Sequence, residues 1–153
     1  MRFRHLAISA LTVALVMTMA PRAAAQGRLA TAKALSCSFQ RSATGSWSKA
    51  GAATAVVKPS MLVLRFEAID FDDGTAQLRT GKVASEVVAK TAEGYAHFMQ
   101  VFRTGPLYTT TVFDKDANGK LKAVHSRHEY FATPLPGSTS SPEQYYGECE
   151  VTK

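Results

Sequence analysis

Residues 95–131, YAHFMQVFRTGPLYTTTVFDKDANGKLKAVHSRHEYF, decide the fold class of this chain. Two turn signals, Thr104-Gly105-Pro106 and Asp114 to Gly119, divide the stretch into three segments. Each segment is rich in aromatic and β-branched residues, which favour strands. Because the turns are short, the segments are predicted to be consecutive antiparallel strands over Tyr95–Phe102, Leu107–Phe113 and Leu121–Phe131.

The chain before this stretch continues the pattern. Residues Leu62–Ile69 alternate between apolar and polar positions, as in a half-buried strand. Asp70-Phe71-Asp72-Asp73-Gly74 follows as a turn, because Asp-Gly favours the positive φ angles of tight hairpins. Thr75–Thr80 and Lys82–Thr91 are predicted as further strands. Helical spacing fits Lys82–Thr91 almost as well, but its β-branched residues favour a strand.

Downstream, a loop precedes one last strand. Thr133–Pro142 carries three prolines and several Ser and Thr residues, which is typical of an exposed loop. Gln144–Val151 is the last predicted strand. The sequence therefore predicts one all-β domain over residues 36–153, an antiparallel up-and-down barrel or sandwich of about seven to eight strands.

The first 25 residues have the composition of a cleaved secretory signal. Arg2, Arg4 and His5 form a basic head, Leu6–Met19 is apolar, and Ala23-Ala24-Ala25 supplies the small residues of a cleavage site. No later segment is apolar enough to form a stable membrane span. We expect a periplasmic or secreted protein whose residues 26–35 form a flexible lead-in to the β domain.

The charge of the mature chain is modest. The full sequence has 18 Lys and Arg residues against 12 Asp and Glu. Three arginines, Arg2, Arg4 and Arg22, would leave with the signal, and the remaining net charge of +3 is ordinary for a soluble protein. Nucleic-acid binding usually needs a concentrated basic surface. We therefore expect no nucleic-acid partner.

Cys37 and Cys149 are the only cysteines and lie near opposite ends of the mature chain. In an oxidising compartment an isolated pair predicts one structural disulfide. Neither cysteine belongs to a Cys-x-x-Cys redox motif. The bond would make the first and last strands neighbours, as a closed or nearly closed barrel requires.

Two strings carry a resemblance to known proteins. Val112–Glu129, with its centre Ala123-Val124-His125-Ser126-Arg127-His128, and Gln144-Tyr145-Tyr146-Gly147-Glu148-Cys149 resemble a group of small secreted proteobacterial proteins of unknown function. At fold level the chain is similar to calycin-type barrels, because Gly45-Ser46-Trp47 matches the Gly-x-Trp of lipocalins. The resemblance implies a calycin-like barrel and brings no known activity.

The segment His125–Glu129 contains the strongest candidate site. Alternation in a strand would place Ser126, His128 and Tyr130 on one face and His125, Arg127 and Glu129 on the other. We expect Arg127 to be structural, joining neighbouring strands through its five donors. A barrel of about eight strands is either filled by side chains or holds one small ligand. If it holds a ligand, the expected contacts are Ser126, His128, Tyr130, Tyr108 and Phe98.

Three functions remain open on the sequence alone. The leading hypothesis is a barrel that binds a small, partly apolar molecule. The alternative is a structural envelope protein or one that binds another envelope protein. The sequence does not indicate the oligomeric state. The third is a hydrolase or metal-dependent enzyme using His97, His125 or His128. We expect no enzyme activity, no cofactor and no metal, and we interpret Asp114–Gly119 as a hairpin turn although it partly mimics a calcium loop.

Overall fold

The computed structural model describes residues 23–48, 50–129 and 141–153. Within them the chain forms one helix and eight strands. Their bounds are α1 (Ala23–Ala30), β1 (Ala34–Trp47), β2 (Ala53–Asp70), β3 (Thr75–Thr80), β4 (Val83–Ala92), β5 (Tyr95–Val101), β6 (Leu107–Ala117), β7 (Lys120–His128) and β8 (Glu143–Thr152). No helix in the described ranges is long and apolar enough to cross a membrane.

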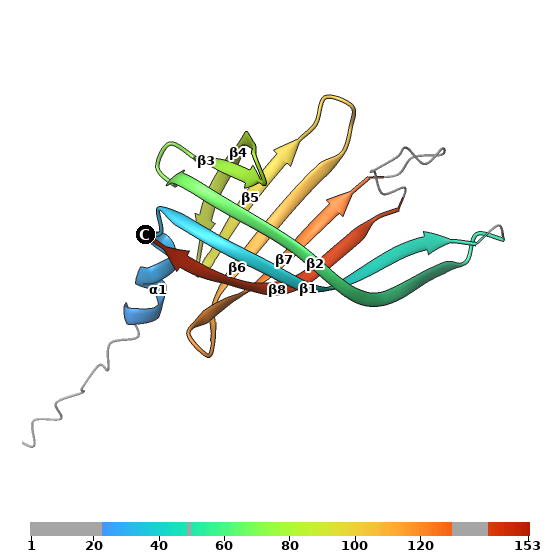
Figure 1. Ribbon diagram of the computed structural model, residues 1–153, viewed down its shortest axis with the longest axis horizontal. Coiled ribbons are helices and arrows are strands. Elements are labelled where there is room, and N and C mark those ends of the chain that lie inside the picture. The colour runs from blue at the N-terminus through green and yellow to red at the C-terminus, as the bar shows by residue number, and fades with distance from the viewer. Residues whose placement is uncertain (1–22, 49, 130–140) are drawn as a thin grey trace, which may run out of the picture.

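The eight strands form a closed antiparallel barrel (Figure 1). Each strand pairs with the next one along the chain, and β8 pairs with β1 to complete the ring. The prediction of an all-β, up-and-down fold is confirmed, and of the two architectures considered the chain adopts the barrel. Of Lys82–Thr91, where a helix fitted almost as well, all but Lys82 lies in strand β4.

The turns form where glycine and aspartate predicted them. After β2, the Asp70 carboxylate accepts the backbone N–H groups of Asp72 and Asp73 at 3.0 and 2.9 Å. Between β6 and β7, Asn118 and Gly119 both have positive φ, +57° and +85°. Two adjacent residues of positive φ are typical of the tight hairpin turns that match strand twist. Asp116 accepts the Gly119 N–H at 2.7 Å, which supports the interpretation of this segment as a hairpin.

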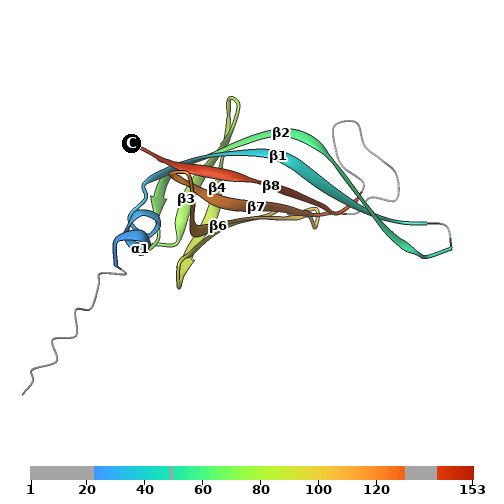
Figure 2. The same ribbon diagram turned by 90° about the horizontal axis from the view of Figure 1, so that it is seen from below.

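The first hairpin is much longer than predicted. Strand β2 begins at Ala53, although the alternation had indicated a start near Leu62. It pairs with β1 over nearly its whole length, from Leu35 opposite Phe66 to Trp47 opposite Ala53. The distal part of this hairpin extends away from the barrel as a two-stranded arm (Figures 1 and 2). Side chains beyond the barrel have no core to face, so the apolar alternation that identifies a strand fades there.

Helix α1 covers one end of the barrel. Its Leu29 and the following Ala32 are almost fully buried in the core. Arg28 lies 3.6 Å from the Asp116 carboxylate and donates to the Gly119 carbonyl at 3.4 Å, so α1 is held beside the β6–β7 turn. Residues 26–35, predicted as a flexible lead-in, include the end of this helix, and Leu29 and Ala32 reach the core and cap the barrel. The proposed signal, apart from its last residues, and most of the Thr133–Pro142 loop lie outside the described residues.

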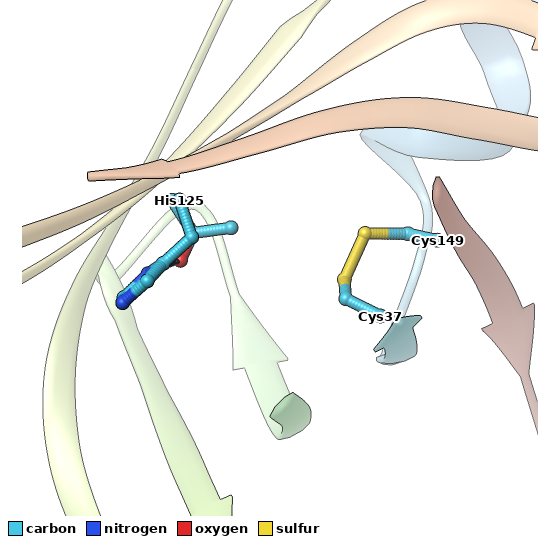
Figure 3. The surroundings of a disulfide bond; sticks show 4 residues. Cys37, His125 and Cys149 are labelled. Atoms are coloured by element: carbon cyan, nitrogen blue, oxygen red, sulfur yellow. Dashed lines mark hydrogen bonds between the residues drawn. A yellow bond between two sulfur atoms is a disulfide. The ribbon is translucent and has the colours of Figure 1, made fainter. Parts of the chain in front are cut away.

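A disulfide joins the two strands that close the ring. Cys37 in β1 and Cys149 in β8 are directly opposite each other in the ladder, with Cα atoms 4.0 Å apart. Both are fully buried. Figure 3 shows the bond inside the barrel, in the same interior as His125. The predicted disulfide is confirmed, and it indicates an oxidising compartment.

Strands β1 and β8 approach each other closely near Gly147. The pairing register shifts between Phe39 and Arg41 of β1, opposite Gly147 and Tyr146 of β8. A Cβ atom placed on Gly147 would lie only 2.0 Å from the Ser38 carbonyl oxygen. Only glycine fits this crossing, because the Cβ atom of any other residue would overlap the backbone of Ser38 and Phe39, which cannot move aside as a side chain can.

We expect loss of the disulfide to destabilise the barrel without unfolding it. The bond spans 112 residues of sequence. In the chain-entropy model a loop of this size contributes about 4–5 kcal/mol. A Cys37→Ala/Cys149→Ala variant should therefore show a lower urea midpoint with an unchanged β-type circular dichroism spectrum. Reducing agent should lower the urea midpoint of the native protein and leave that of the variant unchanged. Equal urea midpoints for the variant and the oxidised native protein would contradict the prediction.

We also expect Gly147→Ala to destabilise the barrel severely, by about 3 kcal/mol, because the added methyl group overlaps backbone atoms of β1. Gly45→Ala is the matched control in the same strand pair. A Cβ at Gly45 would meet the Pro142 carbonyl at an ordinary 3.8 Å, and its φ is not positive. Chemical denaturation of both variants provides the comparison. Equal stability of the two variants would show that β8 moves freely away from β1.

Candidate functional site

The barrel interior divides into two chemically different halves. Around α1 and the disulfide the inward side chains are apolar. Toward the other end, where β7 leads out and β8 leads in, they become polar. The apolar half includes Leu35, Phe39, Leu64, Phe66, Leu78, Val87, Phe98, Val112 and Leu121. The polar half consists of Ser42, Ser85, Gln100, Tyr108, Thr110, His125, Arg127, Glu129, Glu143 and Tyr145.

The centre of the polar half is built from cross-strand neighbours on β6, β7 and β8. In one row Thr110 lies opposite His125, and His125 lies opposite Tyr145. In the next row Arg127 lies between Tyr108 and Glu143. Directly opposite residues of antiparallel strands have adjacent side chains on the same face. The ladder thus brings together residues far apart in the sequence.

Arg127 lies between two aromatic rings. Its guanidinium carbon is 5.3 Å from the centre of the Tyr108 ring and 5.0 Å from that of Tyr145. Both distances are within the range of cation–π attraction. This attraction offsets part of the cost of burying the charge. From β7 the side chain therefore contacts both neighbouring strands.

His125 is almost fully buried beneath this arginine. Its Nδ1 atom is 2.9 Å from the Thr110 hydroxyl, and its Nε2 faces the Arg127 Nε–H at 3.5 Å. Because arginine can only donate, this arrangement favours the neutral ring with its proton on Nδ1. Burial, together with the positive charge of Arg127, lowers the pKa of His125 to about 4. The ring is uncharged at neutral pH.

Two buried glutamates complete the network. Tyr108 donates its hydroxyl to Glu129 at 2.7 Å, and Tyr145 donates to Glu143. Burial and these acceptors raise the pKa of each tyrosine to about 12. Both phenols therefore remain protonated donors.

The rim supplies further contacts to Glu143. Its other oxygen accepts from the Thr44 hydroxyl at 3.1 Å and lies 3.9 Å from Lys58 Nζ. The charges of Arg127 and Lys58 thus balance those of Glu129 and Glu143.

The residues predicted to contact a ligand lie in several places. Tyr108 belongs to the polar half, but Phe98 is stacked on Phe66 in the apolar half, with ring centres 4.0 Å apart. Ser126 and His128 alternate with the inward residues of β7 and point away from the interior, and His128 is exposed. Tyr130 lies outside the described residues.

The face of β7 predicted to contact a ligand, which carries Ser126 and His128, is the outer face of the barrel. The inner face carries His125, Arg127 and Glu129, and the sequence did not identify it as the inner one because both faces carry polar groups. A signal existed upstream: Leu121 and Ala123 have the same parity as His125, whereas Lys120 and Lys122 have the opposite parity. The buried Glu143 and Tyr145 had no comparable signal, because only the β7–β8 pairing brings them beside β7.

The histidines considered for catalysis do not gather in one place. His125 is inside the barrel and His128 outside it. His97, on β5, contacts the Thr111 hydroxyl at 3.1 Å on the outer surface. Among the residues that the structure describes, no group of three or more His, Cys, Asp or Glu side chains could hold a metal ion.

Comparisons of the chain with models of protein families, with curated proteins and with solved structures found no match.

We expect His125 to make folding stability depend on pH. Its folded pKa of about 4 lies below the ordinary histidine pKa of 6.5, so the unfolded chain binds more protons between these values. The contribution is present above pH 6.5 and is lost as pH falls toward 4, by about 3 kcal/mol at most. Urea unfolding of His125→Gln should show a shallower loss of stability over this interval than the native protein.

His128→Ala is the matched control, because His128 lies three residues further along β7 and is exposed. It should reproduce the acid sensitivity of the native protein. Parallel pH profiles for the native protein and His125→Gln would contradict the assignment.

Proposed function

We propose that the protein is a periplasmic or secreted barrel that binds a small, uncharged, partly apolar molecule in the polar half of its interior. One observation carries the proposal: an arginine, two glutamates and a histidine are placed inside a barrel whose other half is closed by apolar side chains. The disulfide supports an extracytoplasmic location.

The buried charges of the polar half would cost folding free energy if their role were purely structural. Burial of a charged group costs several kcal/mol even when it is paired, and apolar replacements of buried ion pairs are often neutral or stabilising. The α1 end shows that this chain can fill the barrel with Phe, Leu and Val. Buried charges that break the local pattern are most often found at functional sites. This contrast within one barrel favours a binding role.

Arg127 is the group best placed to meet a ligand. It is only partly buried, and within the described part of the chain its guanidinium donates through Nε, toward His125. The two terminal nitrogens of the guanidinium therefore have donors to offer. A carbonyl or hydroxyl oxygen of a ligand would fit them, since guanidinium donors form a planar fork.

The charge balance of the site indicates an uncharged ligand. Arg127 and Lys58 offset Glu129 and Glu143, and His125 is neutral. An anion at Arg127 would meet both carboxylates, and a cation near them would meet Arg127. The aromatic rings of Tyr108, Tyr145 and Phe39 surround His125 at centre-to-centre distances of 5.8 to 5.9 Å, which supplies apolar surface for the body of the molecule.

Native mass spectrometry of the protein purified from its own host tests the proposal. We expect a copurified small molecule, and we expect Arg127→Lys to retain about tenfold less of it. Lysine keeps the positive charge that balances the glutamates but lacks the planar fork. The result would separate recognition by the guanidinium from general stability of the site.

His128→Ala serves as the control, since it changes the neighbouring outer surface of the same strand. It should retain the molecule at the native level. A native protein that carries no small molecule, or equal retention by Arg127→Lys and His128→Ala, would contradict the proposal.

A further inference from the structure

Strand β2 has a long edge without a partner. It is paired with β1 from Ala53 to Phe66, but β3 is short and pairs with β2 only from Arg65 onward. Within the described part of the chain, residues 53–64 therefore pair on one side alone. Their unpaired backbone groups can accept another strand, which is the usual hazard or use of an exposed edge.

The side chains along this edge are apolar and exposed. Val57, Met61 and Val63 share the outer face of β2, with 65%, 99% and 52% of their surfaces accessible. Between Ala53 and Leu64 the only charged residue is Lys58. Natural edge strands usually carry several charges to prevent pairing. This edge carries one lysine and Pro59, a residue that strands tolerate at edges.

We propose that two copies of this chain associate through their β2 edges, antiparallel about a twofold axis at Ser60. The partner must be a strand, because the free groups are those of a backbone edge. A second β2 also matches the side chains. With Ser60 opposite its symmetry mate, Val57 faces Val63 of the other copy and Pro59 faces Met61.

This register also keeps the two Lys58 side chains apart. Lys58 would lie opposite Leu62 of the other copy, whereas a shift that brings Lys58 opposite itself would place like charges together. The outer apolar row of each strand would continue across the axis. Because both copies use the same surface, the association stops at a dimer, and neither β2 edge remains free for a third chain.

The arm gives the association a physical advantage. A two-stranded hairpin is at best marginally stable by itself in water. Around Ser60, β1 is also paired with β8, so joining the two β2 edges would produce one continuous sheet with the order β8-β1-β2-β2-β1-β8 and cross-strand apolar pairs at its centre. Lys58 is the one residue shared with the candidate site, where its ammonium lies 3.9 Å from Glu143; the other polar groups of the site face the interior.

Sedimentation equilibrium of the disulfide-bonded protein tests the association. We expect a dimer, and we expect Met61→Lys to raise its dissociation constant by about tenfold or more, since a charge would lie in the apolar row. Met61 is almost fully accessible, so the substitution should not disturb the barrel. Val83→Lys is the control, because Val83 is similarly exposed, at 66%, but lies at the start of β4. It should sediment like the native protein.

A cysteine at the proposed axis tests the register. Opposed residues of an antiparallel pair have Cα atoms about 4.5–5.5 Å apart, within disulfide range. Ser60→Cys should therefore form a bond between two copies on mild oxidation, identified by peptide mapping, and Thr54→Cys near the tip of the arm should not. A monomer at every concentration would overturn the proposal. A dimer that Met61→Lys leaves intact, or that Ser60→Cys fails to cross-link, would overturn it equally.

Discussion

Closure of the ring between β1 and β8 is the interaction on which the rest of the structure depends. Six of the other seven strand contacts join neighbours across short turns and form locally, and the seventh joins β7 to β8. The β1–β8 contact joins segments at opposite ends of the domain and therefore has the largest loop-closure entropy to overcome. The ladder and the Cys37–Cys149 bond meet this demand at the same place. Gly147 permits the close crossing that the closure needs.

Closure has a consequence for the interior. Once β8 lies between β7 and β1, the inward residues of all three strands must share one space. Near α1 that space is filled by Phe39, the disulfide and their apolar neighbours. Toward the other end the same strands contribute His125, Arg127 and Glu143. A barrel with one packed half and one polar half has a rigid base beneath its candidate binding groups, which keeps their positions defined.

Unequal strand lengths explain the other distinctive feature of the molecule. Only the last third of β2, from Arg65 to Asp70, pairs with β3, and the remainder pairs with β1 alone. The arm therefore exposes a backbone edge and apolar side chains that the barrel does not use. The interior and the arm are separate surfaces of one fold, and they offer binding to different kinds of molecule: a small ligand in one case and a β-strand in the other.

The sequence by itself determined the local structure and the chemistry of the disulfide. Strand preference, Asp-Gly and Asn-Gly turns and two isolated cysteines all act over short distances or through a unique pairing, so a single chain was sufficient to predict an antiparallel β domain with a Cys37–Cys149 bond. It did not determine which face of β7 is the inner one, because charged and polar residues occupy both faces between His125 and Glu129. It also did not reveal α1 as a cap or β2 as an arm. Only the tertiary structure decided these points: the environment of a side chain depends on which strands pair, and the surroundings of Arg127, between Tyr108 of β6 and Tyr145 of β8, exist only because both strands pair with β7.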